Sequence, residues 1–123
     1  MIIIIGGAYQ GKLDYAKEEF GLDESDIYHC DESYPADFGK KAVNGLHKYI
    51  WYTVCNGQEL DYENIYEKLK DKIVICGDIS AGIVPMEAQR RRWREETGRL
   101  MAFLCKRSDR VIRVFCGIGT VIK

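Results

Sequence analysis

Short apolar runs alternate along this chain with longer stretches in which apolar residues recur every three or four positions. The short runs lie at Ile2–Ile5, Ile27–Cys30, Ile73–Cys76 and Val111–Cys116. They are rich in β-branched residues, and Ile2–Ile5 is unbroken, as expected of a parallel strand that is buried on both faces. Thr120–Lys123 is expected to add a last strand at the edge of the sheet.

The longer, amphipathic stretches predict four helices. These are Lys12–Phe20, Gly39–Cys55, Asp61–Lys70 and Pro85–Lys106. Gly21 follows the first helix, and an Asn-Gly pair closes the second. One apolar stripe of the second helix consists of Val43, Leu46, His47, Ile50, Trp51 and Val54. The stripe of the fourth helix consists of Trp93, Thr97, Leu100, Met101 and Leu104.

Strands that alternate with helices predict a three-layer α/β sandwich around a mainly parallel sheet. The length of 123 residues suits one domain, which we expect to span residues 1–123. Ligands of such sheets bind at the carboxyl ends of the strands. Functional residues are therefore sought where the predicted strands end.

The segment Gly6–Lys12 directly follows the first strand and fits the pattern G-x-x-x-x-G-K of a phosphate-binding loop. Glycines let the backbone N–H groups converge on one phosphate, the next helix adds its positive dipole end, and Lys12 adds a full charge. The order of strand, loop and helix predicts a P-loop NTPase-like fold. The predicted nucleotide-binding residues are Gly6, Gly7, Ala8, Tyr9, Gln10, Gly11, Lys12 and Leu13.

Leu13 stands where such a loop normally has the serine or threonine that ligates magnesium. An acid at the end of a second apolar strand can hold the metal directly or through water, and Asp78 follows the strand Ile73–Cys76. Asp78, with Ser80 as a further candidate, is therefore the predicted Mg²⁺ residue. The alternative is that Asp78 is an acid that caps a loop.

Three further groups have two interpretations each. His47, in an apolar stripe, is either an acid–base or nucleophilic group at the pocket edge or a satisfied core residue. His29 ends a strand and could approach the phosphate site. Arg90–Arg92 and Arg94 are either forks for phosphate or, as we favour, a solvated face paired with Glu87, Glu95 and Glu96 at helical spacings.

Composition narrows the choice of partners. The net charge of -1 gives no reason to expect nucleic acid, and no apolar run approaches the ~20 residues that span a bilayer. The five cysteines are widely spaced without a C-x-x-C pair, so we expect buried thiols rather than zinc or disulfides. These features predict a cytoplasmic protein.

The sequence IIIIGGAYQGK resembles the start of the adenosylcobinamide kinase / adenosylcobinamide-phosphate guanylyltransferase family of cobalamin assembly. The family's C-terminal half is similar to Gly82-Ile83-Val84-Pro85, to Arg94 with Gly98-Arg99-Leu100, and to Gly117-Ile118-Gly119 with Ile122-Lys123. The similarity covers Met1 to about Ala16 and Ile73–Lys123. The middle is similar to short variants that carry Asn-x-x-His, here Asn44 to His47, on a helix.

The resemblance implies a RecA-like P-loop fold, phosphorylation of a cobinamide hydroxyl by ATP or GTP, and a propeller-like trimer. It implies that Gly6, Gly7, Gly11 and Lys12 bind phosphates, and it aligns Asp78 with the family's usual glutamate. The segment that carries the guanylated histidine in long members has no recognisable counterpart here. That role is therefore transferred to neither His29 nor His47.

Three hypotheses follow. The first is a P-loop kinase in which Lys12, Asp78 and His47 are the candidate catalytic residues, with a nucleotide and a corrinoid as its ligands. The second is a non-catalytic nucleotide- or corrinoid-binding member that has lost guanylyltransferase and kinase activity, as Leu13 suggests. The third is a structural homo-oligomer, because Tyr49, Trp51 and Tyr52 ring the second helix and cannot all face one core.

Overall fold

The computed structural model describes residues 1–79 and 87–123 as a mainly parallel sheet with helices on both faces. The strands are β1 (Ile2–Gly6), β2 (Ile27–His29), β3 (Ala42–Asn44), β4 (Ile73–Gly77), β5 (Arg110–Phe115) and β6 (Ile118–Val121). The helices are α1 (Lys12–Phe20), α2 (Leu46–Cys55), α3 (Tyr62–Leu69) and α4 (Ala88–Arg107), with a 3₁₀ turn η1 (Glu24–Asp26). The predicted Ser80, Gly82 and Pro85 lie outside the described residues.

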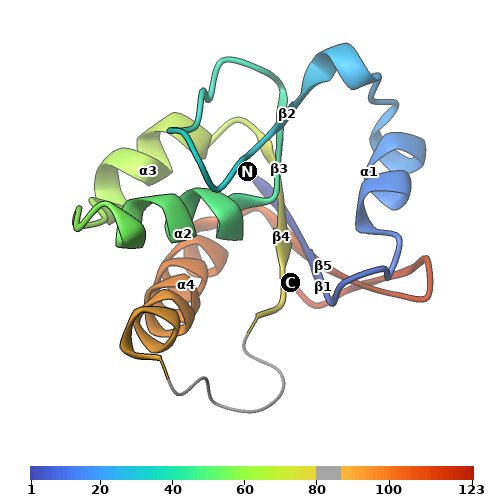
Figure 1. Ribbon diagram of the computed structural model, residues 1–123. Helices are drawn as coiled ribbons and strands as arrows, with labels where there is room; N and C mark the ends of the chain where they lie inside the picture. Colours follow the sequence, from blue (N-terminus) through green and yellow to red (C-terminus); the bar gives the residue numbers. More distant parts are fainter. Residues whose placement is uncertain (80–86) are drawn as a thin grey trace.

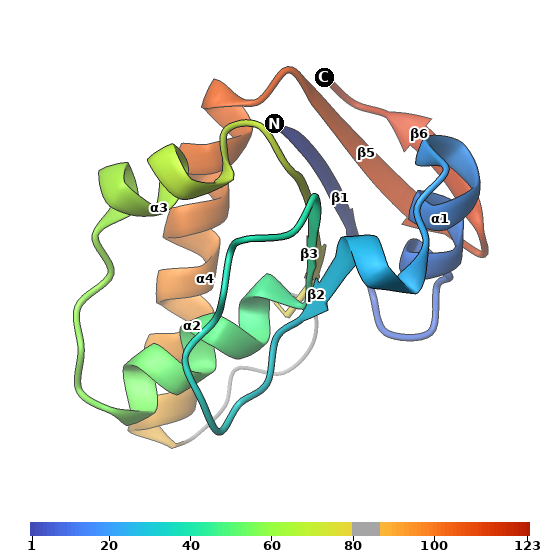
Figure 2. The same cartoon turned by 90° about the horizontal axis from the view of Figure 1, so that it is seen from above.

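The six strands follow the order β2-β3-β4-β1-β5-β6. All neighbours pair in parallel except β5 and β6, which are antiparallel. Figures 1 and 2 show α1 on one face of the sheet and α2, α3 and α4 on the other. The predicted three-layer α/β architecture is therefore confirmed, and β6 begins at Ile118 rather than Thr120.

Successive residues of β1 enter different halves of the core, which explains its unbroken apolar run. Ile3 packs in the cluster with α2, α3 and α4, whereas Ile4 packs in the cluster with α1. Both side chains are fully buried. Val74 and Ile75 of β4 divide between the two clusters in the same way. A strand covered by helices on both faces has no position that favours a polar side chain.

The prediction of one helix over Gly39–Cys55 is wrong, because its first part forms β3. Ala42 and Val43 are fully buried between β2 and β4, where they complete the sheet. Gly45 then adopts a left-handed conformation with φ of 80° and separates β3 from α2. Asn44 accordingly ends a strand, and His47 lies in the first turn of α2. The burial that these residues gain by completing the sheet outweighs the preference for a helix that the spacing of Val43 indicates.

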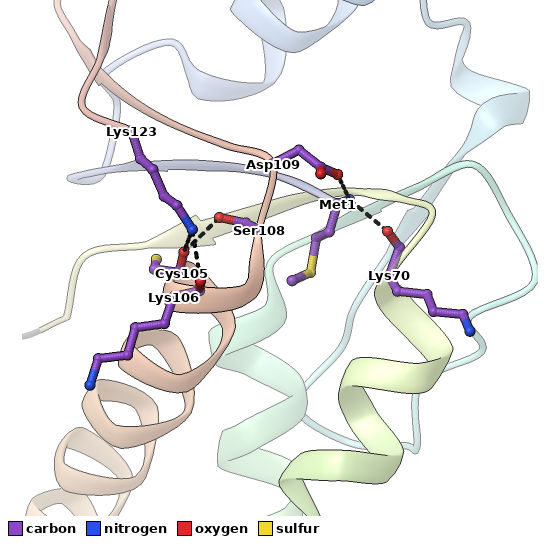
Figure 3. A network of polar contacts seen from close by, with 7 residues as sticks. All are labelled: Met1, Lys70, Cys105, Lys106, Ser108, Asp109 and Lys123. Carbon is purple, nitrogen blue, oxygen red and sulfur yellow. Dashed lines mark hydrogen bonds and ion pairs between the residues drawn. The ribbon is translucent and has the colours of Figure 1, made fainter.

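Polar contacts close the edge of the sheet where the parallel strands begin (Figure 3). The backbone nitrogen of Met1 donates to the carbonyl of Lys70 at 2.6 Å and to the Asp109 carboxylate at 2.7 Å. The Lys123 ammonium donates to the carbonyls of Cys105 and Lys106, both at 2.8 Å, at the end of α4. A cation at this position complements the negative end of the helix dipole. The edge where the strands begin is thus occupied by structural contacts.

Two other observations bear on the composition. None of the helices in the described part of the chain is long and apolar enough to cross a membrane. The expectation of buried thiols holds for Cys30 and Cys76, but Cys55 and Cys116 are exposed. Cys55 ends α2, and Cys116 occupies the tight turn between β5 and β6, so neither position faces the core.

Gly6→Ala tests how closely β1 and β5 must approach. A Cβ at Gly6 would lie 2.6 Å from the backbone oxygen of Val114, so a strand must shift. We expect a loss of about 1–3 kcal/mol in the free energy of unfolding, measured by urea denaturation. Gly98→Ala is the control, since its Cβ would meet no atom of residues 1–79 and 87–123 within 4 Å. This substitution should stabilise α4 by about 0.5–1 kcal/mol. Equal stability of Gly6→Ala and the wild type would contradict this packing.

Candidate functional site

The edge where the parallel strands end brings the three predicted catalytic residues together. The predicted phosphate loop follows β1, Asp78 follows β4, and His47 opens α2 after β3. The Asp78 backbone N–H donates to the carbonyl of Gly6 at 2.8 Å. The Gly77 N–H donates to Nδ1 of His47 at 3.0 Å. The last residue of β4 and the residue that follows it therefore link the histidine and the loop.

The predicted phosphate loop curls around its own lysine. Lys12 Nζ donates to the carbonyl of Gly7 at 2.7 Å, and partial burial lowers the pKa of this ammonium. Gly11 and Tyr9 both have left-handed φ values, of 82° and 60°. No side chain caps the N-terminus of α1, in contrast to α3, where Asp61 accepts from the third helical N–H. Among the described residues, the first N–H groups of α1 are thus available to an anion.

The turn between β5 and β6 supports this loop from the side. The side-chain oxygen of Gln10 accepts a hydrogen bond from the N–H of Cys116 at 2.7 Å. The backbone carbonyl of Gln10 accepts one from the N–H of Gly117 at 2.8 Å. Gly119 leaves room for the ring of Tyr15, which would lie 2.3 Å from a Cβ there. The sequence reasoning missed this support, although two glycines one residue apart at Gly117 and Gly119 signal a close approach of the backbone.

Leu13 is part of the packing beneath α1 rather than of a metal site. Its half-buried side chain packs against the cluster that contains Ile4 and Ala16. Within residues 1–79 and 87–123, no three histidine, cysteine or acidic side chains are grouped to hold a metal. Mg²⁺ bound to a nucleotide commonly takes one or two carboxylates and the phosphates as ligands. Asp78 fits that limited role, but a metal centre built by the protein alone does not fit these residues.

His47 is held as a neutral side chain. Burial is the main cause that lowers its pKa to about 4, and the charges of Lys48 and Lys12 contribute. A Cβ at Gly77 would lie 2.9 Å from the imidazole ring, so this close contact depends on glycine. The His47 carbonyl accepts from Nε1 of Trp93 at 2.8 Å. Since Nδ1 accepts from Gly77, the proton lies on Nε2, which leaves no lone pair for nucleophilic attack. This geometry favours the structural interpretation.

A cavity of about 260 Å³ lies between α4 and the ends of β1 and β4, and we call it the α4 cavity. Its lining residues are Ile5, Cys76, Gly77, Asp78, Ile79, Arg94, Thr97, Gly98 and Met101. Burial raises the pKa of the Cys76 thiol to about 12, so this group is neutral and inert. A larger, more open hollow of about 550 Å³ beside Phe38, Lys68 and Lys72 contains none of the predicted site residues.

Thr97 was predicted as part of the core stripe of α4, and it is buried, but its hydroxyl is unusual. Among the described residues, Oγ1 has no hydrogen-bond partner. An unpaired buried hydroxyl costs about 1–3 kcal/mol. The sequence reasoning did not identify Thr97 or Gly98 as site residues. The available signal was the glycine in the middle of a predicted helix.

The remaining candidates lie apart from the loop. His29 contacts Glu24 through Nε2 at 2.8 Å and Asn44 through Nδ1 at 3.0 Å. Of the arginines, Arg90 to Arg92 are exposed, which agrees with the solvated face. Arg90 pairs with Glu87, three residues earlier, at 3.3 Å, which is one of the predicted helical spacings. Arg94 differs from them, because it is half-buried and lines the α4 cavity.

The low pKa of His47 predicts a specific pH dependence of stability. Because the pKa in the folded state, about 4, lies below the ordinary 6.5, the unfolded chain binds more protons between these values. The contribution of neutral His47 to the free energy of unfolding is therefore present above pH 6.5 and is lost as the pH falls through about 4. His47→Asn keeps an acceptor for the N–H of Gly77 but does not titrate in this range. In urea denaturation, the fall in the free energy of unfolding between these pH values should be about 2 kcal/mol smaller in the variant. An NMR titration of His47 with a midpoint near 6.5 would contradict the prediction.

The CobU family model, described as cobinamide kinase / cobinamide phosphate guanyltransferase, matches residues 50–122. The match covers more than half of the chain and includes β4, Asp78, α4 and the β5–β6 hairpin, whereas Gly6–Lys12 and His47 lie before it. No curated protein matches the chain. The family uses nucleotides as substrates, and its members act in cobalamin biosynthesis. This chain belongs to the cobinamide kinase / cobinamide phosphate guanyltransferase family.

Proposed function

We propose that this chain is a kinase that transfers the γ-phosphoryl group of ATP or GTP to a hydroxyl of cobinamide. The observation that carries the proposal is the loop Gly6–Lys12, which lies at the carboxyl end of β1 before the uncapped start of α1 and next to Asp78. The N–H groups of such a loop and a lysine bind phosphates. Because the chain belongs to this family, we take cobinamide as the acceptor.

The proposed step is an in-line phosphoryl transfer. The acceptor hydroxyl oxygen forms a bond to the γ-phosphorus, and the bond from that phosphorus to the bridging oxygen breaks. The nucleoside diphosphate leaves with the electron pair, and the hydroxyl proton passes to water. Lys12 stabilises the charge that develops on the phosphoryl oxygens. Asp78 would hold the Mg²⁺ that a nucleotide carries, which would neutralise charge on the phosphates. Gly7, Ala8, Tyr9, Gln10 and Gly11 would bind the phosphates through their backbone N–H groups. Neutral His47 positions the end of β4 through Gly77.

A second candidate function is a non-catalytic nucleotide- or corrinoid-binding protein. The position of the half-buried Leu13 favours it, because an apolar side chain that packs against the core replaces the hydroxyl that normally binds magnesium. Such a protein would bind nucleotide with the same affinity with and without magnesium and would show no turnover. Leu13→Ser would then create magnesium-dependent turnover if the lost hydroxyl is the only missing part.

Lys12→Ala tests the nucleotide site. We expect isothermal titration calorimetry to detect ATP or GTP binding by the wild type and no binding by the variant, because the charge that faces the phosphates is lost. Lys17→Ala is a matched control, since Lys17 lies on the same helix but pairs with Glu24. Unchanged affinity in Lys12→Ala would reject the site. Titrations with and without Mg²⁺ separate the two functions, since the kinase requires magnesium-dependent binding.

We also propose a homo-oligomer, a trimer being the arrangement implied by the resemblance. The aromatic surface predicted on α2 stays a prediction: Tyr49, Trp51 and Tyr52 are all partly exposed, although Tyr49 contacts Phe38 and Trp51 contacts Trp93. Exposed apolar side chains gather on the β5–β6 hairpin and the residues after it. These are Phe115, Ile118, Val121 and Ile122, each more than half exposed. An apolar edge strand of this kind is a common site of association.

Ile118→Lys tests this surface. We expect analytical ultracentrifugation to show a smaller species than the wild type, because a charge replaces an apolar contact at the proposed interface. Gln89→Lys, an exposed polar position on α4 outside this surface, is the control. A wild type that sediments as a monomer would contradict the proposed homo-oligomer.

A further inference from the structure

We propose that the α4 cavity receives the hydroxyl-bearing arm of the acceptor and that Thr97 is the residue that hydrogen-bonds to it. This assignment rests on the proposed kinase function and adds to it a place and a chemistry for the second substrate. The cavity lies at the same edge of the sheet as Lys12 and is bounded by Asp78 and by Ile5, which directly precedes Gly6. An alcohol held there lies beside the predicted position of the γ-phosphate.

The first supporting observation is the unpaired hydroxyl of Thr97. A buried threonine in a helix usually donates to the carbonyl four residues earlier, and Thr53 in α2 does so with Tyr49 at 3.0 Å. Thr97 is equally buried and lies in the middle of α4, yet within the described residues its Oγ1 has no partner. A valine would fill the same space without an unpaired hydroxyl. The packing of the described residues therefore gives no reason for a hydroxyl here, and Thr97 is among the residues that line the cavity.

The second observation is the neighbouring Gly98. Glycine weakens the interior of a helix, and no close contact with the described residues demands it here, because a Cβ at this position would meet none of their atoms within 4 Å. This contrasts with Gly6, Gly77 and Gly119, where a Cβ would collide with other residues. Gly98 also lines the α4 cavity. A glycine that the chain itself does not need keeps the space above α4 open for a ligand.

The lining of the cavity defines the chemistry of the occupant. Ile5, Cys76 and Met101 give it an apolar wall, while Thr97 and Arg94 add polar groups from successive turns of α4. Pockets for whole drug-sized ligands measure roughly 300–1,000 Å³, so about 260 Å³ suits a short arm only. A corrinoid ring would therefore remain outside, with one aliphatic arm that ends in an alcohol inside the cavity.

Thr97→Val is the direct test, with Thr97→Ser as the variant that retains the hydroxyl. The probe is cobinamide in its dicyano form, titrated in the presence of nucleotide and followed by its visible absorbance. We expect cobinamide affinity about tenfold weaker in Thr97→Val and close to wild type in Thr97→Ser. The affinity for ATP or GTP should be unchanged in both. Urea denaturation should show that Thr97→Val is at least as stable as the wild type.

Gly98→Leu tests the space above the helix independently of Thr97. The larger side chain has room at its Cβ and should not impair folding, but it should close the cavity and abolish cobinamide binding. Glu95→Leu, an exposed position of α4 that does not line the cavity, is the matched control. It should bind cobinamide as the wild type does.

The outcomes separate this assignment from the proposed function. If the wild type binds cobinamide and both Thr97→Val and Gly98→Leu bind it equally well, the acceptor lies elsewhere and the assignment is overturned, while the kinase proposal stands. If the wild type binds nucleotide but no cobinamide, the assignment is likewise overturned. If Lys12→Ala keeps full nucleotide affinity, the kinase proposal itself fails.

Discussion

The fold depends on the central position of β1, which is paired with β4 on one side and with β5 on the other. Its isoleucines pack alternately into the two halves of the core, so every position of the strand is enclosed. At its end, Gly6 approaches Val114 too closely for any side chain. β1 ends at this glycine, and the loop that leads to α1 begins directly after it. The position of the candidate phosphate site is thus a consequence of how tightly β1 is packed.

Hydrogen bonds then connect this loop to distant parts of the chain. Gln10 links it to the β5–β6 turn, and Asp78 links its first residue to the end of β4. Gly77 adds His47 to the same network. Each link uses a backbone N–H as donor, and the acceptors are the Gln10 side chain, the Gly6 carbonyl and the His47 ring. A loop held in this way is preorganised for an anion, and preorganisation lowers the entropic cost of binding.

The family match and the geometry support different parts of the functional proposal. The match begins at Ile50, so it covers Asp78 and α4 but not the loop Gly6–Lys12. The loop is supported by its own conformation, above all by the contact of Lys12 with Gly7 and by the uncapped α1. The α4 cavity connects the two parts, because it is bounded by residues of both β1 and the matched region. The proposed acceptor therefore lies where the two independent arguments meet.

Local patterns were enough to predict β1, the loop Gly6–Lys12, α1 and the parallel α/β class, because a strand that is apolar throughout and a glycine-rich turn have few other uses. They failed at Ala42–Asn44, where three residues cannot reveal whether they pair in a sheet or continue a helix. They also could not identify Thr97, since whether a hydroxyl is paired depends on neighbours that only the packed structure brings close. The role of His47 was left open for the same reason. Its pKa follows from burial and from the Gly77 contact, and both arise only when β4 and α2 pack together.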